Sequence, residues 1–248
     1  MNKPVDKKNK SLLNEIGHGN LIAKKGEQVW NWSTAAGKIR LKRRCDIFKR
    51  FIGNEGKIIL ELGCGTGLLT REIAKTRNKI YAIDISNNLL FKAKKRIHSK
   101  NVKFKLEDAH QTTFKDSYFD YIVGNSILHH LDVDLVIEEI YRLLKKAGEF
   151  IFIEPNMLNP QIAMERNIPI VRKLANNSPD ETAFIKWSLK RKLIQAGFRN
   201  VKIEPFDFLH PLTPSFLIDI INLVSRLLEE TPLIKEVAGS LIITGRKI

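Results

Sequence analysis

The stretch "ILELGCGTGLLTREIA" at residues 59–74 decides the fold. An apolar run leads into three glycines at alternate positions, Gly63, Gly65 and Gly67, and a predicted helix follows them. Glycine permits positive φ and lets a ligand lie against the main chain without a Cβ in the way. Since the turn joins a buried strand to the start of a helix, helix amides would face that ligand. The stretch therefore predicts a strand–turn–helix unit built to bind a small molecule.

The same alternation continues along the chain. Short apolar runs predict strands, and stretches with apolar residues at helical spacing predict helices. Because no hairpin signal interrupts the alternation up to residue 155, the pattern predicts parallel βαβ units and an α/β, doubly wound sheet. Strands are expected at 57–62, 79–85, 102–108, 119–126, 149–155, 200–206 and 239–247, and helices at 27–51, 68–76, 87–99, 133–148, 180–196 and 214–230.

Composition excludes several classes of protein. No window approaches the eighteen apolar residues of a membrane-spanning helix, and no secretory signal is visible. Two cysteines, Cys45 and Cys64, do not suggest a disulfide framework, so a cytoplasmic location is expected. The net charge of +15 leaves nucleic acid or an anionic membrane surface open as partners, although lysines scattered on helices are usually solvated. The densest basic segment is 38–50, and residues 1 to about 20 are expected to be disordered or loosely attached.

Polar residues follow the apolar strands at the edge where a doubly wound sheet binds ligands. Asp84 suits a carboxylate that accepts both hydroxyls of a ribose, and Asp108, beside the Ala109 amide, suits an adenine amine. Asn125 ends the fourth strand of the alternation. The glycine spacing departs from the G-x-G-x-x-G of dinucleotide-binding loops, which disfavours an NAD-dependent oxidoreductase. These positions predict a nucleoside ligand without choosing it.

The segments "LELGCGTGLLT", "IDIS", "EDA" and "FDYIVGNSILHHL" resemble motifs I to IV of class I S-adenosylmethionine (SAM)-dependent methyltransferases. The "S-x-L-H-H-L" part is similar to the branch that contains ubiquinone and menaquinone C-methyltransferases. The resemblance covers about residues 57–154. It implies a Rossmann-like, mostly parallel seven-stranded sheet with a reversed last strand, and SAM as the methyl donor. It divides the chain into a helical extension or cap at 1–52 and a SAM-binding domain at 53–248, with an inserted helical cap segment at 205–234.

The resemblance also implies roles for residues. The glycine turn would line the methionine and ribose parts of SAM, Asp84 would bind the ribose, and Asp108 would meet adenine. Each could instead be a cap, a turn residue or core packing. The expected SAM-binding residues are Glu61, Gly63, Cys64, Gly65, Thr66, Gly67, Asp84, Ile85, Asp108, Ala109 and Asn125.

His129 and His130 are the candidates for a general base, because histidine titrates near neutral pH and both follow the fourth strand. One of them could instead pack under the loop. A base is needed only where the acceptor carries a proton that must leave. The motif after that strand lacks an Asn-Pro-Pro-Tyr sequence, so oxygen or carbon acceptors are favoured over nucleic-acid amines. No metal is expected.

Two segments could select the acceptor. One contains Trp30 and Trp32, which could cover a pocket or merely anchor the segment. The other is 205–234, whose broad apolar stripe could be core, roof an apolar acceptor pocket or touch a membrane surface. The sequence thus predicts methyl transfer to an oxygen or carbon of a small or lipid-like molecule. An RNA methyltransferase and a non-catalytic SAM-binding protein are the alternatives.

Overall fold

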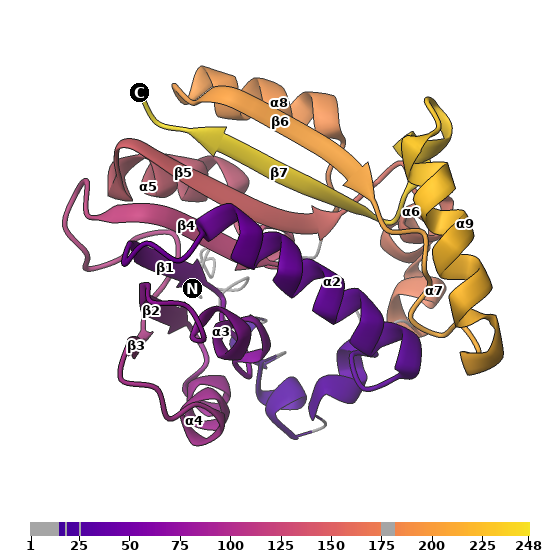
Figure 1. Cartoon of the computed structure of the whole chain (residues 1–248), viewed down its shortest axis with the longest axis horizontal. Coiled ribbons are helices and arrows are strands. Elements are labelled where there is room, and N and C mark those ends of the chain that lie inside the picture. Colours follow the sequence, from indigo (N-terminus) through magenta and orange to yellow (C-terminus); the bar gives the residue numbers. More distant parts are fainter. Residues whose placement is uncertain (1–14, 18, 25, 175–181) are drawn as a thin grey trace, which may run out of the picture.

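Seven strands form one twisted sheet that runs through the centre of the molecule (Figure 1). The structure is a computed structural model that describes residues 15–17, 19–24, 26–174 and 182–248. The strand order is β3-β2-β1-β4-β5-β7-β6, and β7 runs antiparallel to both of its neighbours. The predicted seven-stranded sheet with a reversed last strand is confirmed. The strands are β1 (Ile58–Leu62), β2 (Lys79–Asp84), β3 (Val102–Leu106), β4 (Phe119–Asn125), β5 (Leu144–Pro155), β6 (Arg199–Phe206) and β7 (Ser240–Arg246).

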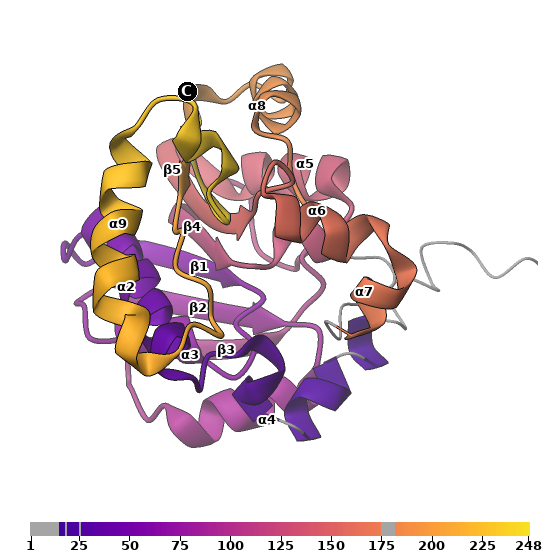
Figure 2. The ribbon, with the colours of Figure 1, turned by 90° about the vertical axis from the view of Figure 1, so that its right-hand side faces the viewer.

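Helices cover both faces of the sheet, as Figure 2 shows in a view turned by 90°. Helices α2 (Ala35–Ile52), α3 (Leu68–Ile73) and α4 (Asn87–Arg96) pack on one face, where Phe48 and Ile73 are fully buried. Helices α5 (Val133–Leu143) and α8 (Lys186–Gln195) pack on the other face, where Ile140 and Leu193 join the core. Burying apolar side chains on both faces explains why the central strands are almost wholly apolar.

The fifth strand begins earlier than the sequence predicts. Helix α5 ends at Leu143, whereas apolar spacing and Gly148 predicted a helix to 148. Leu144 already pairs with Phe119 of β4, and Ala147 has a left-handed backbone with φ +63°. Pairing with a distant strand therefore overrides the helical propensity of "LKKAG".

The N-terminal region also departs from expectation. Residues 15–17 and 19–24 are helical, and Gly19 is buried against Ser86, so the expected disorder is wrong at 15–17 and at 19–20; residues 1–14 and 18 lie outside the described part. The single helix expected at 27–51 is split into a 3₁₀ turn, η1 (Gly26–Trp30), and α2. Thr34 separates them because its hydroxyl accepts the Gly37 amide at 2.9 Å, which caps α2.

Two short helices after β5 are absent from the sequence prediction: α6 (Pro160–Asn167), capped by Asn159, and α7 (Pro169–Leu174). Helix α8 begins at Lys186 rather than near residue 180, which itself lies in the undescribed range 175–181. Helix α9 (Ile218–Glu230) precedes β7 and follows a 3₁₀ turn, η3 (Ser215–Leu217). Most of its apolar stripe is exposed, so the interpretation of that stripe as ordinary core is wrong.

Candidate active site

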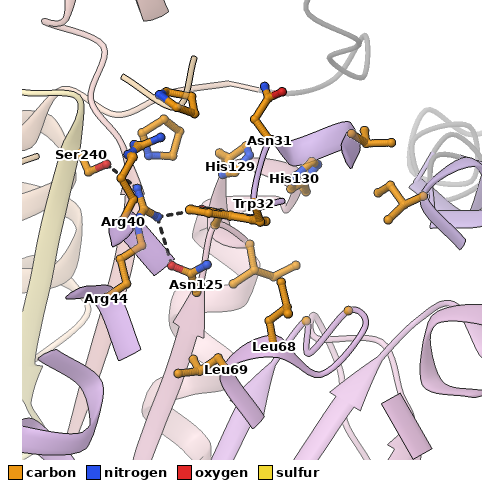
Figure 3. Close-up of a pocket in the computed structure, with 18 of the residues that line it drawn as sticks. Asn31, Trp32, Arg40, Arg44, Leu68, Leu69, Asn125, His129, His130 and Ser240 are labelled. Atoms are coloured by element: carbon orange, nitrogen blue, oxygen red, sulfur yellow. Dashed lines mark hydrogen bonds between the residues drawn. The ribbon is translucent and has the colours of Figure 1, made fainter. Parts of the chain in front are cut away.

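A cavity of about 670 Å³ opens beyond the carboxyl ends of β1, β2, β4 and β5. Parallel strands bring their carboxyl ends to one edge, which is where an open α/β sheet binds ligands. The N-terminal helical residues, α2, α6 and the loop 207–212 close the other sides. Figure 3 shows Trp32, Arg44, Asn125 and the pair His129 and His130 gathered around this cavity. Its volume lies within the range usual for small-molecule sites, about 300–1,000 Å³.

The glycine turn is shaped by backbone conformation and by close packing. Gly63, Gly65 and Gly67 all have positive φ, of +61°, +54° and +81°. A Cβ built on Gly63 would lie 2.4 Å from Ile127 Cδ1, and one on Gly67 would lie 2.8 Å from Ile97 Cδ1. Gly63 and Gly65 line the cavity, whereas Gly67 begins α3 and faces α4. The turn therefore presents bare main chain to the cavity at two of its three glycines.

Asp84 ties the turn to the end of β2. Its Oδ2 accepts the Gly65 amide and its Oδ1 accepts the Ser86 amide, both at 2.8 Å. Burial raises the pKa of Asp84, while the hydrogen bonds from these amides oppose that shift. Since each carboxylate oxygen can accept a second hydrogen bond, the side chain that positions the turn can also meet the hydroxyls of a ligand.

Glu61 is a buried acid in the wall of the cavity. Burial raises its pKa to about 8, and the neighbouring charge of Asp84 adds to the effect. Its Oε2 is buried and has no hydrogen-bond partner among the described residues. A buried polar atom without a partner costs free energy, so the site suits a ligand that brings positive charge or a hydrogen-bond donor.

The other residues predicted to bind SAM fall into two groups, one that lines the cavity and one that lies outside it. Cys64, Thr66, Ile85 and Asn125 line the cavity, and the Arg96 guanidinium donates to the Thr66 carbonyl at 3.0 Å. Burial raises the pKa of the Cys64 thiol well above its ordinary value, so the thiol stays neutral.

Asp108 and Ala109 lie outside the cavity lining formed by the described residues. The Asp108 carboxylate accepts from the backbone amide of His110 at 2.9 Å and contacts Nδ1 of that ring at 2.7 Å. Ala109 is part of the core beside β1. Their contacts with adenine therefore stay predictions.

His129 and Glu154 form a buried pair at the wall of the cavity. His129 Nδ1 lies 2.7 Å from Glu154 Oε2, and Glu154 Oε1 accepts the amides of Ile127 and Leu128 at 2.9 Å each. Burial raises the pKa of Glu154 to about 7, while the hydrogen bonds from these amides and the nearby His130 oppose that shift. Once Glu154 is ionised it can accept a hydrogen bond from Nδ1 of His129, which favours the tautomer with Nε2 unprotonated.

His130 is held differently. Its Nδ1 lies 3.0 Å from Glu15 Oε2 of the N-terminal helical residues, and its ring stacks on His129 with centroids 4.1 Å apart. Both histidines line the cavity. The two neighbours in sequence thus have different carboxylate partners, one on β5 and one on the segment that closes the cavity.

Arg44 is the main site residue that the sequence prediction missed. It is buried on α2, and its guanidinium donates to Asn125 Oδ1 at 3.1 Å, Ser126 Oγ at 3.2 Å and Ser240 Oγ at 2.6 Å. Burial lowers its pKa to about 10, and the charge of Arg40 contributes. The available signal is its place in the basic segment 38–50, but such a segment by itself indicates nucleic acid or a membrane surface rather than a buried site.

A second arginine, Arg40, lies close to Arg44. Arg40 donates to Asp207 Oδ2 at 2.7 Å, and both guanidinium groups lie over the Trp32 ring at 5.7 and 5.2 Å. Trp32 therefore holds cations against the cavity rather than only anchoring its segment. The side chain of Trp30 lies outside what the structure describes.

The residues present fit a cationic nucleoside. The bare turn at Gly63 and Gly65 accommodates a ligand against the main chain, and Glu61 offers a buried oxygen without a partner. SAM carries positive charge on its sulfonium and on its ammonium group. Among the described residues no cluster of metal-ligating side chains is present.

Comparisons with known proteins agree with this geometry. A family model described as "Methyltransferase domain" matches residues 60–152. The chain is 30% identical to the demethylmenaquinone methyltransferase of Lactobacillus johnsonii over 187 residues, which cover 66% of this chain and 77% of that protein. It is 27% identical to the protein of the same name from Geobacillus stearothermophilus over 193 residues, with 68% and 82% covered.

Solved structures share the fold. A SAM-dependent methyltransferase from Thermotoga maritima matches with a TM-score of 0.66 and 19% identity, covering 93% of this chain and all of that one. The Haemonchus contortus phosphoethanolamine N-methyltransferase 2 in complex with SAM matches with a TM-score of 0.60 and 18% identity, covering 83% and 52%. Together with the SAM-compatible cavity, these matches show that the chain belongs to the class I SAM-dependent methyltransferases.

Proposed function

We propose that this methyltransferase transfers the methyl group to a carbon or oxygen of a small, lipid-like acceptor that carries an acidic hydroxyl. The observation that carries the proposal is the 2.7 Å contact between His129 Nδ1 and Glu154 Oε2 at the cavity wall. A histidine oriented by a carboxylate is suited to remove a proton near neutral pH. Such a base serves an acceptor with a hydroxyl proton and is unnecessary for an amine that reacts through its free lone pair.

A hydroquinone ring meets these requirements, and relatives named demethylmenaquinone methyltransferases make it the first acceptor to test. SAM supplies the electrophilic methyl group. His129 Nε2 would take the hydroxyl proton, which leaves electron density on the oxygen and on the adjacent ring carbon. Arg44, buried beside Asn125, would stabilise the negative oxygen in a low-dielectric site. After attack by carbon, that carbon would pass its ring proton to solvent water, which restores the aromatic ring; attack by oxygen needs no further proton transfer.

The RNA alternative finds little support in the basic segment 38–50. Its arginines at 40, 43 and 44 point inward, to Asp207, Glu229 and the cavity. Lys42 and Lys49 contact Asp46 on the same helix. Most of this charge is therefore already paired within the protein rather than presented to phosphates.

The test is methyl transfer from SAM to a short-tailed reduced demethylmenaquinone analogue, followed by mass spectrometry, with a soluble phenol and an RNA fragment as competing acceptors. The turnover rate should rise as the pH increases through about 7, because Glu154 must be ionised to hold the His129 proton. His129→Gln should lower kcat by about 100- to 10,000-fold, the usual contribution of a general base. His130→Gln, the matched control, should retain most of the activity. Methylation of RNA alone, or a pH profile unchanged in His129→Gln, would contradict the proposal.

A further inference from the structure

Helix α9 presents its apolar side to solvent. Phe216, Ile220, Leu223 and Leu227 recur at helical spacing and are exposed, Phe216 to 80% and Leu223 to 64%. Ser225, a polar residue on the opposite side of the helix, is only 1% exposed. A surface helix of a globular protein ordinarily shows the reverse arrangement, so this stripe is built to contact something other than the core.

A second apolar edge lies on α6 and α7. Met164, Ile168 and Ile170 are exposed there, the last to 74%. Figure 1 places α6, α7 and α9 at the same end of the molecule, and Figure 2, which looks onto that end, shows α9 on one side and α6 and α7 on the other. We name the two edges together the apolar rim: Phe216, Ile220, Leu223 and Leu227 on η3 and α9, and Met164, Ile168 and Ile170 on α6 and α7.

Both edges of the apolar rim adjoin, along the chain, residues that line the cavity. Ile162 of α6 lines the cavity two residues before Met164. On the other side, Leu212 lines the cavity four residues before Phe216 and is itself exposed. A flat apolar phase laid against the rim would therefore touch the opening through which an acceptor enters. A second copy of the chain laid across both edges would instead close that opening.

Charge favours an anionic surface over a second copy. The chain carries a net charge of +15, which opposes self-association and attracts anionic headgroups. Lys38 on α2 and Arg226 on α9 are exposed, and within the described part of the chain neither has an ion-pair partner. Asp219 and Glu230 are also exposed on α9, so the attraction to anionic lipids comes from the net charge of the whole chain. Helix α9 packs on α2 through Ile218 and Ala36, so both cations belong to the same end of the fold.

We propose that the apolar rim docks the protein on the surface of a bilayer containing anionic lipids, with the cavity mouth facing the membrane. This inference rests on the proposed function, since an acceptor with an apolar tail resides in the bilayer. Among the described residues no helix is long and apolar enough to cross a membrane. Apolar side chains from two edges would insert at the level of the headgroups, as amphipathic helices do when they lie in the interface.

The experiment is flotation of the full chain with vesicles of phosphatidylcholine alone and of phosphatidylcholine with phosphatidylglycerol. The protein should float with the anionic vesicles, and more weakly or not at all with the neutral ones. The variant with Phe216→Ser and Leu223→Ser should bind the anionic vesicles about tenfold more weakly or worse, because two inserting side chains are lost. The control Phe91→Ser removes an apolar residue of similar exposure, 58%, from α4 and should bind like the wild type. Calorimetry with SAM on each variant confirms that the fold and the donor site are intact.

Equal flotation of the wild type and the double variant would overturn the proposal, as would absence of flotation with anionic vesicles. Concentration-dependent dimerisation that the double variant abolishes, without vesicle binding, would assign the rim to a second copy and also overturn it. Methylation of a short-tailed soluble acceptor separates the two proposals. If the protein floats as expected but methylates no acceptor, the docking surface stands and the proposed function fails. If it methylates that acceptor but never floats, the proposed function stands and the docking surface fails.

Discussion

Replacing Gly63 with alanine tests whether packing against Ile127, in addition to backbone conformation, requires glycine in the turn. Gly63 has φ +61°, and the added Cβ would lie 2.4 Å from Cδ1 and 2.5 Å from Cγ1 of Ile127. A non-glycine residue in the left-handed region costs about 1–2 kcal/mol. Overpacking adds about 1–3 kcal/mol. We therefore expect Gly63→Ala to lower the free energy of unfolding by about 2–5 kcal/mol.

The chain offers a matched control at Gly56, which has φ +73° and no atom within 4 Å of an added Cβ. Gly56→Ala should cost only the conformational part, about 1–2 kcal/mol. Truncating the clashing side chain by Ile127→Ala should relieve the packing part at Gly63. In a double-mutant cycle, the two substitutions should then show a favourable coupling of about 1–3 kcal/mol.

Urea denaturation measures all four variants, and calorimetry with SAM reports the site. Gly63→Ala should weaken SAM binding by about tenfold or more, since a shift of the turn that costs about 1.4 kcal/mol of binding has that effect. Gly56→Ala should leave SAM affinity unchanged. A cost at Gly63 no larger than at Gly56, together with zero coupling to Ile127, would refute the steric argument.

Three further predictions concern charged groups of the site. Burial raises the pKa of Glu61 to about 8, so between pH 4.5 and pH 8 the native state holds a proton that the unfolded chain has lost. The free energy of unfolding is therefore higher at low pH and falls as the pH rises between these two values. Glu61→Gln should remove about 4 kcal/mol of that decline in urea titrations from pH 5 to pH 8.5, whereas the exposed control Glu138→Gln should leave it unchanged. Asp84→Asn replaces an acceptor of two backbone amides and should raise the SAM Kd about 10- to 100-fold by calorimetry; an unchanged Kd would remove Asp84 from the site. Arg44→Lys keeps the charge, but a lysine cannot reach all three side-chain oxygens that Arg44 contacts. The free energy of unfolding should therefore fall by about 1–3 kcal/mol, and the KM for the acceptor should rise. Wild-type values of both quantities would contradict the proposed role of Arg44.

The sequence predicted the fold, and it predicted that the glycine turn and Asp84 share one edge of the sheet, because both depend on local pattern. Gly63 directly follows β1, Gly65 lies in the same turn, and Asp84 ends β2; a strand end is set by its own apolar run. Once the strands are parallel, their carboxyl ends share one edge, so neighbouring strand ends bring these residues together. The Gly65 amide on the Asp84 carboxylate is the contact that follows from this rule.

The contacts around His129 and Arg44 could not be predicted in this way. His129 and Glu154 are 25 residues apart, and Arg44 reaches Ser240 across 196 residues, so each contact depends on how separate elements are packed. Residues 144–148 belong to β5 because Leu144 pairs with β4 and because Ala147 and Gly148 share backbone hydrogen bonds with Lys247. The spacing in α9 shows that the helix has an apolar side, but only the packing of Ser225 and Ile218 against the protein turns that side outward. Periodicity along a chain determines which residues share a face, whereas the direction of that face depends on contacts between segments distant in sequence, and those contacts form only in the folded structure.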